Sequence, residues 1–183
     1  MEHSVVRDLM VPLDEYAVVS IDATLADAVR ALDEAQARLP EGRQPHRAVL
    51  VTDHNGTIVG KIGQLAFLKG LEPKYNMMGE FDRMSRAGVS DELMSTMRNH
   101  FQLFEDPIND ICERGATVPV RDVMHPVKES VAESATLTEA LHHFVVWQQL
   151  SLLVTAGGKV TGLLRLSDLF EVFAKRIGTL GDR

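Results

Sequence analysis

Three residues near the C-terminal end combine a charge, a hydroxyl and a carboxylate in one short stretch. Arg165, Ser167 and Asp168 lie in the run LLRLSDLFE, which begins as an apolar strand and continues as a helix. A carboxylate offers two acceptor oxygens, a guanidinium forms charge-assisted bonds with phosphate, and the N–H groups of a helix start attract anions. The stretch therefore predicts a ligand site. The alternative is a helix cap formed by Asp168 or Ser167, with Glu171 in the first turn.

Other reactive residue types lack partners at a useful spacing. His142 and His143 are adjacent, so on a helix they point in different directions, and no Cys or acid supplies a metal-ligand spacing nearby. Cys112, the single cysteine, has no evident base partner in the sequence. No P-loop, serine-hydrolase elbow or paired-carboxylate motif occurs. We therefore predict no metal site, no catalytic residues and no enzyme activity.

Composition narrows the class of protein. The 183 residues allow one domain or two small subdomains with a shared core, and 45% hydrophobic with 25% charged residues is typical of a soluble globular protein. The net charge of −7 disfavours nucleic-acid binding. The N-terminus lacks the pattern of a signal peptide, and no apolar run is long enough for membrane insertion. With a single cysteine, these features predict a cytoplasmic protein without disulfides.

The chain contains the same ordered pattern twice. VRDLMVP returns as VRDVMHP, ATLADAVRAL returns as ATLTEALHHF, and VLVTDHNGTIVG returns as LLVTAGGKVTG. We divide the chain into a first repeat at residues 1–71, a helical insert at 72–119 and a second repeat at 120–183. Each repeat is predicted to run as lead-in, helix, strand, turn, strand and helix.

Local signals fix several boundaries within the repeats. Thr24 and Thr136 are predicted helix N-caps, and Thr136 with Glu139 is predicted to form a capping box. DHNG and AGGK carry the turn chemistry of hairpins. Two such units packed about a pseudo-twofold axis would form one α/β (α+β) module with ligand clefts between the repeats.

The insert is predicted to contain two helices. The first begins at Ser90 as N-cap; the second has Asp106 as cap, Pro107 as first helical residue and Gly115 as stop. The apolar stripe of the first helix either packs on the module's own core or forms a dimer or partner surface. Methionines concentrate in this region and adapt to varied surfaces: Met77, Met78, Met84, Met94 and Met97.

The ordered motifs resemble a tandem pair of CBS domains, called a Bateman module, over residues 6–71 and 120–177. The resemblance implies two βαββα-type repeats related by a pseudo-twofold axis. It also implies a sensor that binds AMP, ADP, ATP or S-adenosylmethionine between the repeats. Such modules form flat homodimers and regulate a partner protein, here an unknown effector. No obligatory cofactor is implied. The chain continues only a few residues past the second repeat, so we expect a stand-alone module.

The family pattern has a Gly, an apolar residue, a Ser or Thr, and an Asp or Asn three positions later. The resemblance places Asp168 where both ribose hydroxyls donate to a carboxylate, and Ser167 beside a phosphate; Leu164 belongs to the same run. Arg165 departs from the pattern because it replaces the hydroxyl residue. It either pairs with a phosphate or fills the cleft and rejects the ligand.

The opposite repeat is implied to close the site through backbone groups that touch the base. Repeat alignment indicates Val18 on the lead-in loop, with Arg47 and Ala48 at the strand start. His46 lies alongside, and Arg47 or His46 would also meet phosphates. The extra residues around RLPEGRQP, absent from the second repeat, would reshape the adenine pocket.

The first repeat has lost the pattern, since Gly63 and Ala66 stand at its hydroxyl and acid positions. We therefore expect one site per chain, acting by a shift in conformational population. The alternative is a ligand-free structural or protein-interaction module that acts through its dimer and helical insert.

Overall fold

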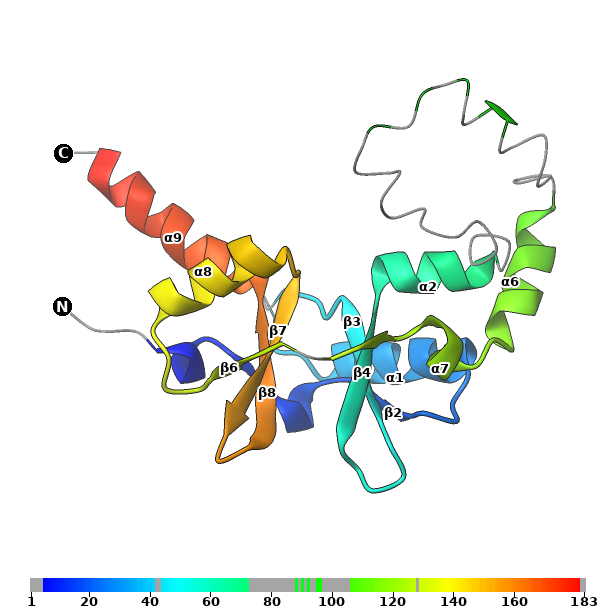
Figure 1. The fold of residues 1–183 in the computed structure, drawn as a ribbon, viewed down its shortest axis with the longest axis horizontal. Coiled ribbons are helices and arrows are strands. Elements are labelled where there is room, and N and C mark those ends of the chain that lie inside the picture. The colour runs from blue at the N-terminus through cyan, green and yellow to red at the C-terminus, as the bar shows by residue number, and fades with distance from the viewer. Residues whose placement is uncertain are drawn as a thin grey trace.

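Two four-stranded sheets with helices around them make up the fold (Figure 1). The computed structural model describes residues 5–41, 44–72, 88, 90, 92, 95–96, 106–127 and 129–181. The strand orders are β2-β3-β4-β5 and β1-β8-β7-β6. This confirms the mixed architecture of two repeats that the sequence predicts.

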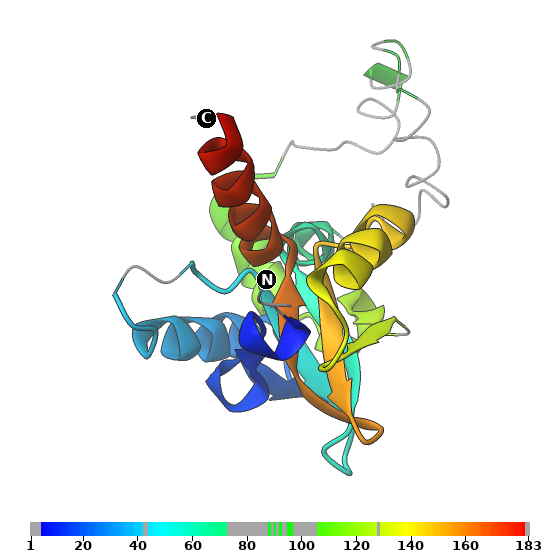
Figure 2. The ribbon, with the colours of Figure 1, turned by 90° about the vertical axis from the view of Figure 1, so that its left-hand side faces the viewer.

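The two repeats build the same unit in the same order. The first repeat contributes β2 (Val18–Ser20), α1 (Leu25–Ala37), β3 (Ala48–Thr52), β4 (Ile58–Gly63) and α2 (Gln64–Leu71). The second contributes β6 (Ser130–Ala132), α8 (Leu137–Trp147), β7 (Ser151–Ala156), β8 (Lys159–Arg165) and α9 (Leu166–Gly181). In each unit the first two strands pair in parallel across a helical crossover, and the last two form an antiparallel hairpin. Helices α1 and α8 lie on opposite sides of the two hairpins (Figure 2).

The lead-in of each repeat joins the sheet of the other. The first lead-in forms 3-10 helices η1 (Val6–Asp8) and η2 (Leu13–Glu15) around β1 (Val11–Pro12), which pairs with β8. The second forms α7 (Val120–Val123) and β5 (His125–Pro126), which pairs with β4. Each sheet is thus completed by an edge strand from the opposite repeat.

Glycines permit these crossed pairings. A Cβ at Gly162 would lie 2.5 Å from the Val11 carbonyl oxygen, and one at Gly60 would lie 2.6 Å from the Met124 sulfur. Both distances are below any ordinary carbon contact. The recurring Gly of the repeat therefore gives the incoming lead-in room to approach.

The apolar interior has three parts, and one of them joins the repeats. Val6 lies in the core of the second repeat and Val120 in that of the first, both fully buried. The third cluster draws on both repeats and contains Val11, Tyr16, Ala48, Leu50, Leu153 and Leu163. A shared core makes the two repeats one packed body, because burial of apolar area is the main stabilising contribution.

Most of the predicted boundary signals are found in the structure. Thr24 and Thr136 each accept a hydrogen bond from the main chain three residues on, at 3.3 and 3.1 Å. The capping box is complete at Thr24, because the Asp27 carboxylate in turn accepts a hydrogen bond from the Thr24 N–H at 3.0 Å. The box predicted at Thr136 is wrong in its second half, since only the bond from the Glu139 N–H is present there.

Of the two helices predicted in the insert, the second is confirmed as α6 (Ile108–Ala116). Pro107 is its N-cap rather than its first residue, and Asp106 pairs with Arg114 at 2.7 Å instead of capping. Gly115 packs against Leu71 of α2, where a Cβ would have no space. The first helix and the methionine-rich region lie largely outside the described residues.

Candidate functional site

The candidate site lies where β8 gives way to α9. Arg165 is the last residue of β8 and α9 begins at Leu166, whose N–H donates to the Leu150 carbonyl at 3.0 Å. Asp168 is therefore the third residue of α9 and faces the interior, with 8% of its surface exposed. The capping alternative for Asp168 is wrong, because the helix starts two residues before it.

Arg165 and Asp168 form a buried ion pair with two parallel hydrogen bonds. Arg165 Nε donates to Asp168 Oδ2 at 2.5 Å, and Nη2 donates to Oδ1 at 2.9 Å. The side chains are only 7% and 10% exposed. This fork-to-fork geometry is the strongest arrangement that the two groups can adopt, and it occupies both carboxylate oxygens.

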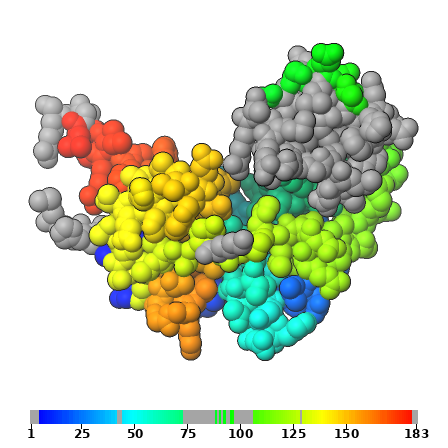
Figure 3. Space-filling view, in the orientation of Figure 1, coloured from blue at the N-terminus to red at the C-terminus, as the bar shows by residue number. Residues whose placement is uncertain are grey.

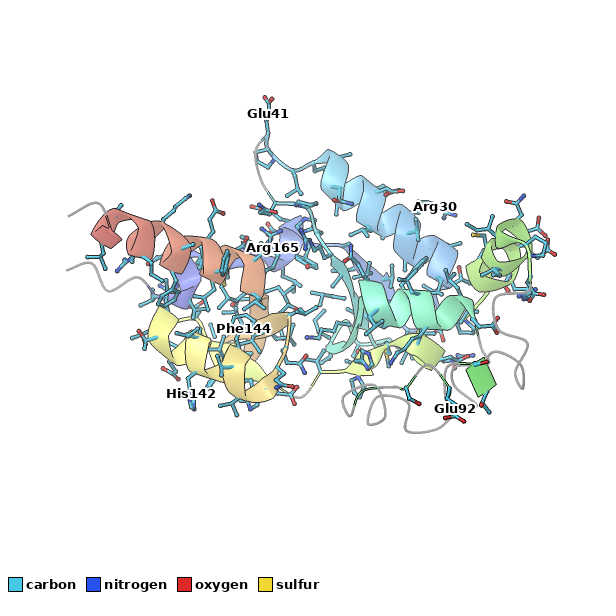
Figure 4. The ribbon with its side chains drawn as sticks, turned by 90° about the horizontal axis from the view of Figure 1, so that it is seen from above. Arg30, Glu41, Glu92, His142, Phe144 and Arg165 are labelled. Atoms are coloured by element: carbon cyan, nitrogen blue, oxygen red, sulfur yellow. The ribbon has the colours of Figure 1, made fainter. Side chains whose placement is uncertain are left out.

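The same guanidinium reaches into the opposite repeat. Arg165 Nη1 donates to the main-chain carbonyls of Gln44 at 2.7 Å and Pro45 at 3.3 Å. Figure 4 places Arg165 between the start of α9 and the segment that precedes β3, whereas Glu41 projects outward. Arg165 therefore ties the extra residues of the first repeat to the candidate site.

Two aromatic rings from the first repeat pack beside this pair. His46 and Tyr16 are 2% and 4% exposed, and their ring centroids lie 4.4 Å apart. Burial raises the pKa of Tyr16 to about 12, while the Arg165 charge opposes this rise and Asp168 adds to it. Burial and then the Arg165 charge lower the pKa of His46, against weaker opposing effects of Glu15 and Asp168. Both rings are therefore neutral near pH 7.

The ring nitrogens of His46 are buried, and neither makes a well-aligned hydrogen bond within the described part of the chain. The main chain of Glu15 is nevertheless close enough to raise the pKa of the ring as a hydrogen-bond partner, against the larger effects of burial and Arg165.

The structure brings together some of the predicted site residues and separates others. Arg165, Asp168 and His46 belong to one buried cluster, and Leu164 is fully buried in the core beside it. Ala48 is buried at the start of β3, whereas Arg47 is exposed. Ser167 is half-buried in the first turn of α9.

Val18 was expected on a loop, and this is wrong. It lies in β2 and pairs with Leu50 of β3, because the lead-in of the first repeat is already extended at Tyr16 and continues parallel to β3. Ala17, the residue before it, accepts a hydrogen bond from the Leu50 N–H at 2.9 Å.

The equivalent junction of the first repeat lies between β4 and α2, and there a lysine side chain crosses to the second repeat. Lys61 of β4 donates from Nζ to the Ser151 carbonyl at 2.8 Å, to Gln149 Oε1 at 3.1 Å and to Ser151 Oγ at 3.3 Å. Burial lowers the pKa of Lys61, and Glu129 acts in the opposite direction. The acid position is Ala66, which is buried. A cation from one repeat thus reaches the other repeat at both junctions.

Sequence reasoning missed Tyr16, Lys61 and the carbonyls of Gln44 and Pro45. One usable signal existed: Arg165 stands directly before a predicted helix whose first turn contains Asp168, so two opposite charges three residues apart could pair at the start of that helix. The other contacts join distant segments and leave no local pattern.

The family comparison agrees with this geometry. A family model for the CBS domain matches residues 6–72 and 120–175. The chain therefore belongs to the CBS domain family, as a tandem pair. Members are regulatory modules. No curated protein matches the chain.

Solved structures share the fold at low identity. The chain is similar to a CBS domain-containing protein of unknown function from Bacillus anthracis, with a TM-score of 0.61, 17% identity and 94% of each chain covered. It is similar to the CBS domain of a membrane protein from Sphaerobacter thermophilus, with a TM-score of 0.59 and 20% identity, covering 93% of this chain and 88% of that one. It is also similar to CBSX2 in complex with AMP, with a TM-score of 0.57 and 21% identity, covering 93% and 97%.

None of the helices in the described part of the chain is both long enough and apolar enough to cross a membrane.

Proposed function

We propose that this protein is a regulatory module whose site at the β8–α9 junction binds an adenosine nucleotide. The observation that carries the proposal is Asp168, a buried carboxylate in the first turn of α9 at the ribose-binding position of the family. Its counterpart in the first repeat is Ala66, so we assign one site to each chain. One similar structure, CBSX2, is a complex with AMP.

In this proposal the module acts by binding and not by catalysis. The nucleotide favours one arrangement of the repeats and an effector protein reads that arrangement, which requires different ligand affinities in the two states. The repeats are residues 1–71 and 120–183 and the insert is 72–119. A cytoplasmic location fits the single, exposed cysteine.

A homodimer is part of the proposal, and exposed apolar side chains support it. Large apolar residues are exposed on α8 and α9: Leu141, Val145, Val146, Phe170, Ile177 and Leu180. Several large apolar side chains exposed on two helices of one repeat are typical of an interaction site. Light scattering coupled to gel filtration tests this, and a monomer at all concentrations would contradict it.

Calorimetry with AMP, ADP, ATP and S-adenosylmethionine tests the nucleotide site. We expect at least one nucleotide to bind, and Asp168→Asn to weaken it by about 10- to 100-fold through loss of charge-assisted bonds to the ribose. The matched control is Glu171→Gln, one turn further along α9 and 51% exposed, which should bind normally. Absence of binding to all four compounds would refute the proposal.

A second candidate is a ligand-free interaction module. It is favoured by the Arg165 fork, which already donates a hydrogen bond to each oxygen of Asp168. This candidate requires that none of the four compounds binds and that the oligomeric state is the same in Asp168→Asn as in the wild type.

A further inference from the structure

A short segment of the first repeat lies against the β8–α9 junction and is held there by the second repeat. We propose that this segment, residues 44–47, is a strap that stays closed over the junction at neutral pH and opens when the His46 ring binds a proton. The inference concerns the protein without a ligand, so it goes beyond the proposed function and its test does not depend on that function.

The strap belongs to the extra length of the first repeat. Residues 38–47 join α1 to β3, whereas residues 148–150 are all that join α8 to β7. The shorter connection turns at Gln148, which has a φ of 50°, and leads directly into its strand. The longer connection has enough chain to lift away while α1 and β3 stay in place, and segments that open locally in native proteins are of this kind.

One attachment of the strap is a latch from the second repeat. Arg165 Nη1 donates to the Gln44 carbonyl at 2.7 Å and to the Pro45 carbonyl at 3.3 Å. The strap residues Gln44 and Pro45 are themselves exposed. Opening breaks these two hydrogen bonds but leaves the pair with Asp168 intact, because that pair uses Nε and Nη2 of Arg165. The strap therefore opens without leaving a buried charge unpaired.

The second attachment is the His46 ring, which is the buried part of the strap. His46 is 2% exposed, and its ring centroid lies 4.4 Å from that of Tyr16. The charged groups that face the ring come from three elements: Glu15 of η2, Arg165 of β8 and Asp168 of α9. Because both repeats enclose the ring, it reaches water only when the strap moves.

Proton binding favours the open strap. Burial and then the Arg165 charge lower the pKa of His46 in the closed state, against weaker opposing effects of Glu15 and Asp168. In water the pKa of the ring returns towards 6.5. The open state therefore binds the proton more tightly, and its population rises as the pH falls below that value. At pH 5.5 the rise is at most about 10-fold, the ratio of protonated to neutral imidazole in water.

The matching connection of the second repeat has no titratable side chain. Its residues are Gln148, Gln149 and Leu150, and Leu150 is 77% exposed instead of buried between the repeats. Lys61 of the first repeat nevertheless holds this connection, through Gln149 at 3.1 Å and the Ser151 carbonyl at 2.8 Å. A cation thus latches each connection, and we expect only the one that contains His46 to respond to pH.

Hydroxyl-radical footprinting with detection by mass spectrometry measures the opening, because the radical oxidises aromatic side chains that water reaches. Tyr16 packs on His46 and is 4% exposed, so it reports on the strap. Phe144 is 3% exposed in the core of the second repeat and reports on unfolding of the whole module. Between pH 7.5 and pH 5.5 the oxidation rate of Tyr16 in the wild type should rise by about 3- to 10-fold, while Phe144 stays protected.

Three variants separate the two attachments. His46→Phe keeps an aromatic ring that cannot bind a proton, so the Tyr16 rate should stay low at both pH values. His142→Phe, at an exposed position of α8, is the matched control and should keep the wild-type rise. Arg165→Met/Asp168→Leu removes the latch without leaving a buried charge, and it should raise the Tyr16 rate at pH 7.5 by about 10-fold through loss of two hydrogen bonds.

Several results would overturn the inference. Equal Tyr16 rates at the two pH values in the wild type would do so, as would a rise of the wild-type size in His46→Phe. An unchanged Tyr16 rate in Arg165→Met/Asp168→Leu at pH 7.5 would show that Arg165 is not the latch. If Phe144 became reactive together with Tyr16, the whole module would be unfolding and the strap would not be a separate element. None of these results decides nucleotide binding at pH 7.5, which calorimetry tests separately.

Discussion

At the β8–α9 junction, Arg165 pairs with an acid of its own repeat and with two carbonyls of the other. At the β4–α2 junction, Lys61 crosses to Gln149 and Ser151 of the other repeat, and Ala66 takes the place of the acid. The space-filling view shows the two hairpins that lead to these junctions as separate lobes along one edge (Figure 3). The comparison teaches that both junctions place a cation across to the other repeat, whereas only the β8–α9 junction adds a carboxylate.

The largest expected difference between the junctions is in stability. Arg165→Met leaves Asp168 buried without its partner and should lower the free energy of unfolding by about 3–5 kcal/mol. The double variant Arg165→Met/Asp168→Leu should recover most of this loss, because no buried charge remains. Urea denaturation measures both, and a double variant as unstable as the single one would contradict this account of the pair.

The second-largest difference is expected between the two glycines that contact the crossed lead-ins, in the stability that each loses on substitution by alanine. In Gly162→Ala the new methyl group meets the Val11 main-chain carbonyl, so we expect a loss of about 2–3 kcal/mol by overpacking. In Gly60→Ala the nearest atom is the sulfur of the flexible Met124 side chain, and the loss should be about 1 kcal/mol. Thermal and urea unfolding compare the two, and the reverse order would show that the second lead-in is the more tightly held.

Lys61→Met tests the β4–α2 junction, where the cation is held by uncharged acceptors. It leaves the Ser151 carbonyl and the Gln149 amide without their donor, so we expect a loss of about 1–2 kcal/mol. This is smaller than for Arg165→Met because no charge is stranded. Lys159→Met, at the exposed start of β8, is the matched control and should be near neutral. A cost equal to that of Arg165→Met would remove the distinction between the junctions.

The smallest effect should appear as a dependence on pH. Because the pKa of His46 is lowered from 6.5 in the folded state, the unfolded chain binds a proton first as the pH falls below that value. His46 should therefore cost stability on acidification, by less than about 1 kcal/mol near pH 5.5, and not at higher pH. His46→Phe should flatten this part of the stability curve, whereas His142→Phe should not, since His142 points outward on α8 (Figure 4). Equal curves for the two variants would exclude His46 as the cause.

The sequence was sufficient to predict the repeats, their element order and the place of Asp168, because each follows from local pattern. It did not predict that the lead-ins cross, since VRDLMVP and VRDVMHP are too alike to show which sheet each one joins. The stack of Tyr16 on His46 and the reach of Lys61 to Ser151 depend on tertiary packing between distant segments. The sequence also left open whether Arg165 pairs with a phosphate or fills the cleft. Its main-chain partners, Gln44 and Pro45, lie in the other repeat and leave no local pattern.

The crossing of the lead-ins makes each half of the molecule a donor and an acceptor at once. Cut within residues 73–105, the chain would yield two fragments, each with an open sheet edge and a strand that fits the other's edge. Mixing them should restore the whole by complementation. A single repeat expressed alone would retain its donor strand and its open edge, and would be drawn into a swapped pair with a second copy of itself.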